Sequence, residues 1–342
     1  MEIPLNLIRE LPKTDLHVHL DGCVRIPTLI ELARKYAVEL PSFDPQGLEK
    51  SVQSGKNCQN LNEYLQGFDI TLSVLQEPDA LFRIAYELAE DAAEENIWYM
   101  EVRFSPILHI RKGLKLTTIV DAVLEGLHKA EKKFNIKTGI IICGMRNINP
   151  ETSLKLAELS VAYKNKGIVG FDLAGQEENY PAKDHKEAFS LIRKNNINTT
   201  AHAGEAFGPE SIHQAIHDCG AHRIGHGTRL YEDGDLLNYV NDHRIPLEIC
   251  ITSNIQTQAA KSYESHPLRL YYDYGLRVTI NTDNRLISDT TLTNEYYLIA
   301  KHLNLNLDDI KSIIMDGFKS AFLPNRAKSI MLNVVNDKLK KY

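Results

Sequence analysis

Short apolar runs alternate with longer amphipathic segments along nearly the whole chain. The short runs are rich in β-branched residues, which is typical of strands buried in a sheet. The longer segments carry apolar residues at helical spacing with charged residues opposite, which is typical of helices packed on a core. The pattern predicts strands at residues 14–19, 98–104, 137–145, 168–173, 197–202, 223–226, 246–250 and 277–281. It predicts helices between them, including residues 27–36, 77–95, 117–135 and 150–166.

The alternation of strands and helices indicates a parallel sheet. Eight such units favour a closed (β/α)8 TIM barrel over an open doubly wound sheet. An open sheet would also place a glycine-rich phosphate turn after its first strand. Here the first strand runs into Leu20-Asp21-Gly22-Cys23, which is no such turn. No linker or repeat divides the chain, so we predict one α/β barrel domain over residues 1–342.

Residues 37–75, after the first predicted strand and helix, are too many for a plain crossover connection. They contain four apolar residues spaced i, i+3, i+4 and i+7, which form one helix face: Leu61, Tyr64, Leu65 and Phe68. Spacing alone favours a helix packed on the barrel. An insertion after a barrel strand lies at the catalytic end, however, and this position supports a helical lid over a site.

Composition places the chain among ordinary globular proteins, with 43% hydrophobic and 25% charged residues. A net charge of −6 offers no basic patch for nucleic acid, and the apolar runs are too short to cross a bilayer. The N-terminal segment lacks the charged and apolar regions of a secretory signal. The five cysteines are scattered and form no CxxC pair. We therefore expect reduced thiols, a cytoplasmic protein and no thiolate metal site.

Histidine and aspartate residues stand at the ends of four predicted strands: His17, His19, His202, His226 and Asp283. His17 and His19 are two positions apart in a strand, so their side chains point to the same side. In a (β/α)8 barrel the carboxyl ends of all strands meet at one mouth. Each residue alone could be an ordinary hydrogen-bonded side chain, but their convergence indicates a metal site.

Imidazole and carboxylate donors without a thiolate suit zinc. By position, the predicted ligands of one zinc ion per chain are His17, His19, His202 and Asp283. A zinc site that keeps a position for water makes hydroxide available near neutral pH. His226 would then be free to orient or deprotonate the water.

Glu205 lies three residues beyond His202, across a short Ala203-Gly204 turn. Burial would keep its carboxyl group protonated, and it could then protonate a heterocycle bound at the mouth. A carboxylate at a helix N-terminus is equally compatible with this position. The two interpretations are evenly balanced on the sequence alone.

Seven short segments carry most of this polar chemistry: KTDLHVHLDG (13–22), EVRFSP (101–106), DLAG (172–175), HAGE (202–205), RIGHG (223–227), TSN (252–254) and NTD (281–283). Together, and in this order, they resemble the motifs of the adenosine deaminase family in the amidohydrolase superfamily. The apolar face formed by Leu61, Tyr64, Leu65 and Phe68 also resembles the hydrophobic gate of that family. The resemblance covers nearly the whole chain.

This resemblance implies a barrel of the metal-dependent hydrolase type and hydrolytic deamination of a purine nucleoside. Water activated at the zinc would attack C6 of the purine. Glu205 would donate a proton to N1, and His226 would serve the attacking water. Adenosine and 2′-deoxyadenosine would give inosine and 2′-deoxyinosine with release of ammonia, a reaction of purine salvage.

The resemblance also implies how the nucleoside is held. The backbone of Gly175 would contact purine N3, and Asp21 would hydrogen-bond a ribose hydroxyl group. After Asp283 the family often carries a second aspartate, which donates to N7 in its protonated form. This chain has Asn284 there, whose amide can donate to N7 without protonation. Arg285 could reach a larger or anionic substrate, but a structural ion pair is the favoured interpretation.

Three other functions are compatible with the sequence. A deaminase of 5′-modified adenine nucleosides, such as methylthioadenosine or aminodeoxyfutalosine, would use the same chemistry, although Asp21 favours a free hydroxyl group. A non-catalytic nucleoside-binding homologue would be expected to have lost Glu205 or a zinc ligand. A hydrolase of amides or phosphate esters would need a second metal, and strand four offers no lysine to bridge it. We expect a small-molecule purine nucleoside as partner, no nucleic acid or membrane, and a monomer or weak homo-oligomer.

Overall fold

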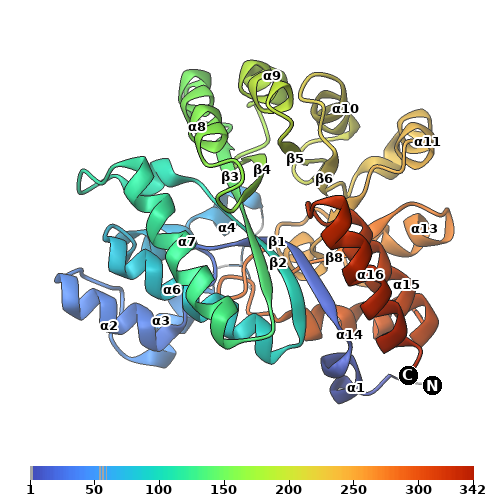
Figure 1. Cartoon of the computed structure of the whole chain (residues 1–342), viewed down its shortest axis with the longest axis horizontal. Helices are drawn as coiled ribbons and strands as arrows, with labels where there is room; N and C mark the ends of the chain where they lie inside the picture. The colour runs from blue at the N-terminus through green and yellow to red at the C-terminus, as the bar shows by residue number, and fades with distance from the viewer. Residues whose placement is uncertain (1–2, 54, 56–57, 59) are drawn as a thin grey trace.

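Eight parallel strands form one sheet whose order in space is their order in the chain, and the sheet curls into a nearly closed barrel (Figure 1). The structure is a computed structural model and describes residues 3–53, 55, 58 and 60–342. Helices surround the described strands on the outside, so the predicted (β/α)8 barrel is confirmed. The strands are β1 (Lys13–His19), β2 (Ile97–Phe104), β3 (Lys137–Met145), β4 (Ile168–Ala174), β5 (Asn198–Ala203), β6 (Arg223–His226), β7 (Leu247–Ile249) and β8 (Val278–Ile280).

Several of the surrounding helices begin at residues that suit a helix N-terminus. Pro78 and Pro150 occupy the first turn of their helices, where a backbone N–H has no partner within the helix. Asn149 also caps its helix, because its side chain accepts a hydrogen bond from the Glu151 N–H. The α-helices are α1 (Leu5–Glu10), α2 (Ile26–Tyr36), α3 (Pro45–Val52), α4 (Leu61–Leu65), α5 (Gly67–Val74), α6 (Pro78–Glu94), α7 (Leu116–Lys133), α8 (Pro150–Ala162), α9 (Lys186–Lys194), α10 (Pro209–His217), α11 (Gly234–Asp242), α12 (Ile251–Gln256), α13 (Leu268–Asp273), α14 (Leu292–His302), α15 (Leu307–Ser320) and α16 (Asn325–Leu339).

Alternate residues of β1 face the surrounding helices and the barrel interior. Thr14 lies against Gly317 of α15, where a Cβ atom added to the glycine would sit 2.3 Å from Thr14 Oγ1. His17 faces the interior and contacts Glu248 of β7. The period-two alternation of a strand therefore directs His17 and His19 to the same inner side.

Strands β1 and β8 are joined through the segment that follows β8. The His19 N–H donates to the Asp283 carbonyl, and the Asp283 N–H donates to the His17 carbonyl, both at 2.8 Å. Asp283 and His226 have left-handed backbone angles, with φ of 59° and 63°. Residues other than glycine adopt such angles rarely, and they concentrate at functional sites. The backbone that closes the barrel thus also positions side chains at its mouth.

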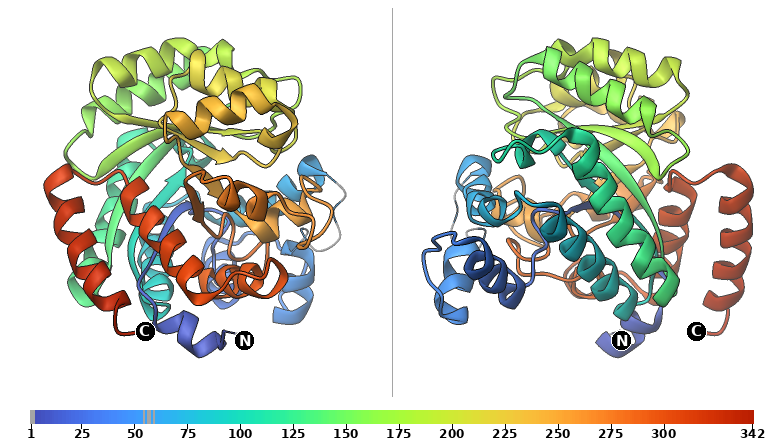
Figure 2. Two further views of the ribbon diagram at one scale, coloured as in Figure 1. Left: turned by 90° about the vertical axis from the view of Figure 1, so that its right-hand side faces the viewer. Right: turned by 60° about the vertical axis from the view of Figure 1, so that its left-hand side comes forward.

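The insertion contains α3, α4 and α5, which stand together at one side of the barrel (Figure 2). Its residues 54, 56–57 and 59 lie outside the described residues. The prediction of a single helix over the apolar face is wrong in extent, because α4 ends at Leu65 and α5 begins at Gly67, a poor helix former. Leu61 and Tyr64 are buried in the core, and Leu65 and Phe68 are partly buried against it.

In the part of the chain that the structure describes, no helix has both the length and the apolar character needed to span a bilayer. All five cysteines are buried and form no disulfide. Cys143 lies within β3 and Cys250 directly follows β7, where both pack as small buried side chains.

Candidate active site

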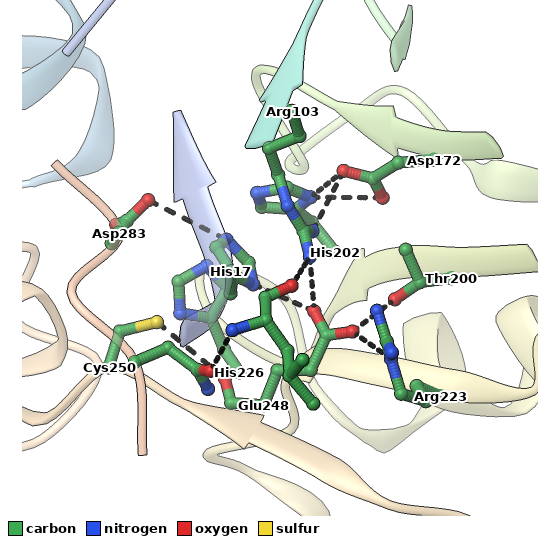
Figure 3. Close-up of polar contacts among 12 residues, drawn as sticks. His17, Arg103, Asp172, Thr200, His202, Arg223, His226, Glu248, Cys250 and Asp283 are labelled. Atoms are coloured by element: carbon green, nitrogen blue, oxygen red, sulfur yellow. Dashed lines mark hydrogen bonds and ion pairs between the residues drawn. The ribbon is translucent and has the colours of Figure 1, made fainter. Parts of the chain in front are cut away.

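Five predicted site residues meet at one mouth of the barrel, and Figure 3 shows four of them, His17, His202, His226 and Asp283. Ligand atoms of His17, His202, His226 and Asp283 all lie within 4.8 Å of one another, and all four side chains are buried. His19 adjoins them, with its Nε2 3.1 Å from His202 Nε2 and 3.4 Å from Asp283 Oδ1. The cluster thus forms where the ends of β1, β5 and β6 meet the short segment that follows β8.

The arrangement of these side chains fits a divalent metal ion. His17 Nε2 is buried without a hydrogen-bond partner among the described residues, and Asp283 Oδ1 lies 3.6 Å from it. Nitrogen ligands about 2.0–2.1 Å from a tetrahedral zinc ion would stand about 3.3 Å apart. The Nε2 atoms of His19 and His202 are separated by 3.1 Å. The four side chains whose ligand atoms lie within 4.8 Å of one another include His226 and not His19. Together with His19, five side chains could therefore provide ligands for one ion.

Carboxylates behind two of the histidines set the orientation of their rings. Glu248 Oε2 lies 2.9 Å from His17 Nδ1, and Asp172 Oδ2 lies 3.1 Å from His202 Nδ1. Each Nδ1–H can therefore donate to a carboxylate, and in the neutral ring Nε2 is then unprotonated and directed at the cluster. Histidines that bind metals commonly have such a partner on the other ring nitrogen.

The same two carboxylates are held by buried arginines. Arg103 donates to Asp172 at 3.0 Å and to Glu248 at 2.8 Å, and Arg223 donates to Glu248 at 2.6 Å (Figure 3). Burial alone would raise the pKa of Glu248, but Arg103 and Arg223 hold it well below its usual range. Burial also opposes ionisation of Asp172, whereas His202 and Arg103 lower its pKa. Both groups are therefore ionised acceptors behind the histidines.

Glu205 is buried beside the cluster, with its Oε2 3.5 Å from His226 Nε2. Its Oε1 accepts a hydrogen bond of 3.1 Å from the Thr257 hydroxyl group. The next helix, α10, begins only at Pro209. Glu205 therefore does not lie in the first turn of a helix, and its side chain belongs to the mouth of the barrel.

The surroundings of Glu205 disfavour its charged form. Burial, followed by the negative charges of Asp283 and Glu177, raises the pKa of Glu205 well above its usual range. The hydrogen bond from Thr257 acts in the opposite direction but does not prevail. These surroundings therefore favour the protonated carboxyl group, which can act as an acid.

A second carboxylate holds the loop that carries Glu205. Glu177, in the segment after β4, accepts hydrogen bonds of 2.6–3.0 Å from the backbone N–H groups of the four consecutive residues 204–207. Converging amides of this kind form a site for an anion, which here is a side chain of the same protein. The position of Glu205 thus depends on the neighbouring loop as well as on its own.

Two pockets of about 230 and 250 Å³ adjoin the cluster. The larger reaches Glu205 and Leu61, and the smaller reaches His19. The lining of the smaller pocket also includes Asp21, Leu65, Phe68, Asp69 and Gly175. Apolar residues of both α4 and α5 therefore border the space beside the cluster.

Asp21, which lines the smaller pocket, has an unsatisfied oxygen. Its Oδ1 is buried without a hydrogen-bond partner among the described residues. Burial raises the pKa of Asp21 to about 7. A buried polar atom without a partner is costly in free energy, so a hydroxyl donor from a ligand would be favoured there.

Asn284 is hydrogen-bonded to the lid insertion. Its Nδ2 donates to the Tyr64 hydroxyl group at 2.8 Å, and that hydroxyl group lies 2.7 Å from Ser288 Oγ. The Asn284 Oδ1 stands against Gly22, where an added Cβ atom would be 2.0 Å away. Tyr64 therefore ties α4 to the segment after β8 by polar contacts, in addition to its apolar packing.

Arg285 forms a partly buried ion pair with Glu95. The other oxygen of Glu95 accepts a hydrogen bond of 2.8 Å from the Thr293 N–H. The favoured interpretation of Arg285 as a structural ion-pair residue is therefore confirmed.

The sequence patterns assign no role in the site to Glu248, Asp172, Arg103 or Glu177. Glu248 carries a detectable signal, because it is a carboxylate in the middle of an apolar strand. Asp172 and Arg103 lie within the quoted motifs, but their partners come from other strands. Glu177 lies in a loop without periodicity, and its contacts give no signal in the sequence.

The chain is similar to known deaminases over nearly its whole length. A family model described as adenosine deaminase matches residues 12–338. The Dictyostelium discoideum protein named "Probable adenosine deaminase" is 44% identical over 340 residues, which are 99% of this chain and 44% of that protein. This chain therefore spans less than half the length of that relative.

Two further matches cover almost the whole length of both aligned proteins. The adenosine deaminase of Clostridium kluyveri is 39% identical over 316 residues, which are 92% of this chain and 91% of that protein. The crystal structure of the arabidopsis N6-mAMP deaminase MAPDA matches with a TM-score of 0.87 and 27% identity. That match covers 97% of this chain and 99% of the plant chain.

Proposed function

The chain belongs to the adenosine deaminase family of hydrolytic deaminases, and we propose that it removes the C6 amino group of adenosine and 2′-deoxyadenosine. The products are inosine or 2′-deoxyinosine and ammonia. The observation that carries this proposal is the buried Glu205 carboxyl group, 3.5 Å from His226 and beside a buried cluster of histidines and an aspartate, in surroundings that raise its pKa well above its usual range. Deamination at C6 needs an acid at N1 and an activated water at C6, and these two groups match those needs.

One zinc ion per chain is assigned to His17, His19, His202 and Asp283. When bound, zinc supplies a Lewis acid that lowers the pKa of a water ligand toward about 7. Imidazole and carboxylate donors without a thiolate suit this ion. The carboxylates behind two of the rings support the assignment, because they keep Nε2 of each ring unprotonated.

Glu205 acts as the acid. Its carboxyl proton passes to purine N1, which interrupts the aromatic conjugation and makes C6 more electrophilic. Water then adds at C6 and gives a tetrahedral carbon. The water loses two protons as its oxygen becomes the C6 carbonyl: one goes to the amino group, which leaves as ammonia, and the other returns to Glu205. Burial and the neighbouring negative charges raise the pKa of Glu205 well above its usual range, which favours the protonated form that this step needs.

His226 holds the attacking water. Its Nε2 lies 3.5 Å from Glu205 Oε2, on the same side as the cluster. Burial, followed by the neighbouring His17, lowers the pKa of His226 well below its usual range. The ring is therefore neutral and can orient a water molecule by a hydrogen bond.

Three residues are assigned to the nucleoside. Gly175 contacts purine N3 through its backbone, Asn284 contacts N7 through its amide, and Asp21 accepts a hydrogen bond from a ribose hydroxyl group. Gly175 has a left-handed φ of 92°, which allows its backbone to line the pocket at a position where other residues would be strained. The unsatisfied Asp21 Oδ1 supports the contact with the ribose.

The smaller pocket favours a free 5′-hydroxyl group over a 5′-phosphate. Its lining contains the two carboxylic acids Asp21 and Asp69 and neither lysine nor arginine. A phosphate there would meet two acidic side chains and no cation. We therefore assign this chain to nucleosides, in contrast to the plant relative that is named for N6-mAMP.

A second candidate substrate is an adenine nucleoside with an apolar 5′ group, such as methylthioadenosine. The smaller pocket has an apolar side that could accept it, formed by Leu65, Phe68, Leu72, Leu108 and Met145. Asp21 opposes this candidate, since an apolar thioether would leave its buried Oδ1 unsatisfied.

A substrate panel tests the proposal. Conversion of adenosine, 2′-deoxyadenosine, methylthioadenosine and AMP is followed by the loss of ultraviolet absorbance. We expect adenosine and 2′-deoxyadenosine to have the highest kcat/KM, with AMP at least about 100-fold lower because of charge repulsion. A preference for AMP or methylthioadenosine would contradict the substrate, and inactivity on all four would contradict the reaction. A Glu205→Gln protein prepared in parallel serves as the control, because its activity sets an upper limit for activity from contaminating enzymes.

A further inference from the structure

A chain of buried hydrogen bonds runs from the start of α13 to His226. The Leu268 N–H donates to His266 Nδ1 at 3.1 Å. His266 Nε2 lies 3.2 Å from Asn254 Oδ1, and Asn254 Nδ2 lies 3.0 Å from His226 Nδ1. The side chains of His266, Asn254 and His226 are all buried, so bulk water does not compete for these contacts.

The backbone donor sets the direction of the whole chain. Since an N–H group can only donate, His266 Nδ1 must be unprotonated, and the proton of this ring is on Nε2. Burial lowers the pKa of His266 to about 3, so the ring is neutral. Its Nε2–H donates to Asn254 Oδ1, and this contact turns the Asn254 amide nitrogen toward His226. His226 Nδ1 must then accept, which leaves the proton of its neutral ring on Nε2.

The partner of Nδ1 distinguishes His226 from the two histidines that have carboxylate partners. Glu248 and Asp172 accept from Nδ1 of His17 and His202, so each of these rings presents an unprotonated Nε2 to the cluster. The amide behind His226 donates instead, and the ring presents an Nε2–H. A protonated nitrogen has no lone pair for a metal ion, but it can donate a hydrogen bond.

We propose that Asn254 and His266 are positioning residues that hold His226 as an Nε2–H donor and keep it from coordinating the metal. The consequence for catalysis rests on the proposed function. There, His226 donates a hydrogen bond to the oxygen of the attacking water, and it does not remove the proton of that water. The metal then takes its fourth protein ligand from His19, although the His226 ring lies as close to the cluster.

Nuclear magnetic resonance of the metal-free protein tests the tautomer directly. In protein labelled with ¹⁵N-histidine, long-range ¹H–¹⁵N correlations separate protonated from unprotonated ring nitrogens, and a His226→Asn variant assigns the signals. We expect a protonated Nε2 and an unprotonated Nδ1 for His226. A protonated Nδ1 in the wild-type protein would overturn the proposal.

The variant Asn254→Asp reverses the polarity of the chain with little change of shape. Its carboxylate can accept from both histidines, so we expect Nδ1 of His226 to become protonated. We expect kcat to fall about 10–100-fold, as for other partners that orient a site histidine. An unchanged His226 tautomer in this variant would also overturn the proposal.

Substitutions at His266 separate positioning from mere packing. His266→Leu removes the donor to Asn254, and we expect His226 to lose its single tautomer and kcat to fall about 10–100-fold with a smaller change in KM. His266→Gln keeps one donor and one acceptor and should restore most of kcat. The control is His109→Leu, because His109 is another buried histidine, hydrogen-bonded to the Leu75 carbonyl. Equal losses of kcat in the two leucine variants would contradict the positioning role.

The spectroscopic result does not depend on the substrate. An Nε2–H tautomer that responds to Asn254→Asp, in a protein inactive on adenosine, would support the hydrogen-bond chain and refute the proposed function. An active enzyme with a protonated Nδ1 on His226 would give the reverse conclusion. The two proposals can therefore fail independently.

Discussion

His17 on β1 and Glu248 on β7 meet inside the barrel, with His17 Nδ1 2.9 Å from Glu248 Oε2, although the two residues are 231 positions apart in the sequence. The same carboxylate accepts hydrogen bonds from Arg103 and Arg223. One side chain therefore connects the orientation of a histidine at the mouth to the buried charges of the barrel interior.

Glu248→Gln should weaken metal binding. The amide would present a donor where His17 Nδ1–H needs an acceptor, so the ring would lose its fixed orientation. We expect the metal affinity, measured by competition with a chromophoric chelator, to fall about 10–100-fold. Wild-type protein should contain about one zinc ion per chain by elemental analysis.

The matched control for this variant is Glu101→Gln. Glu101 lies in the same buried network and forms an ion pair with Arg223, but it contacts neither His17 nor His202. Both variants should lower the free energy of unfolding, since each leaves a buried arginine partly unpaired. An equal loss of metal affinity in the two would show that Glu248 acts through stability alone.

Glu205→Gln should remove the acid while it preserves the shape of the side chain. An amide cannot deliver a proton to N1, so we expect kcat to fall about 10²–10⁴-fold with a small change in KM. Steady-state kinetics with adenosine measures both. A variant that keeps more than about one tenth of wild-type kcat would contradict the role of Glu205 as the acid.

The pH profile should report the same group. Since the protonated form of Glu205 is the active one, kcat/KM should fall as pH rises through the pKa of Glu205, and this fall should come at a higher pH than for an ordinary carboxyl group. Thr257→Val removes the hydrogen bond that lowers this pKa. The basic limb should then move to higher pH, and a limb that stays in place would argue against the assignment.

Asp21→Asn should discriminate between substrates that differ only at the ribose 5′ position. We expect kcat/KM for adenosine to fall about tenfold, because the amide oxygen is a weaker acceptor than the Asp21 carboxyl group, whose pKa of about 7 leaves it partly ionised near neutral pH. The value for 5′-deoxyadenosine, which lacks the hydroxyl group, should change little. Equal losses for both nucleosides would place Asp21 away from the 5′-hydroxyl group.

Gly22→Ala should displace the Asn284 amide without any direct contact with the substrate. The new Cβ atom would lie 2.0 Å from Asn284 Oδ1, so this side chain must move. We expect kcat/KM to fall in Gly22→Ala and in Asn284→Ala, with no further loss in the double variant. Unaltered kcat/KM in Asn284→Ala would contradict the role of Asn284 in recognition of the purine.

The convergence of polar residues at the mouth could be predicted because topology alone produces it. Once His17, His202 and Asp283 are placed at the ends of different barrel strands, the fold brings them together whatever lies between. The carboxylates behind the rings could not be predicted in this way. The partner of His17 depends on which residue of β7 points inward and on the tilt of the strands, and periodicity specifies neither.

The insertion shows that a continuous apolar pattern can run across the boundary between two helices. The apolar spacing from Leu61 to Phe68 is continuous, but α4 ends and α5 begins within it. Gln66, between the two helices, keeps right-handed helical angles of −63° and −27°. The backbone therefore continues its helical turn between α4 and α5, and the side chains on either side of Gln66 keep the spacing of a single helix.

The four backbone amides gathered by Glu177 also bear on how this enzyme can be altered. Because Glu205 lies on the loop after β5 and Glu177, which holds its backbone, lies on the loop after β4, the two loops can be replaced only together. A chimera that receives only the β5 loop of a relative would acquire an acid without the carboxylate that fixes its backbone. Loop grafting at this mouth should succeed only when both segments are transferred together.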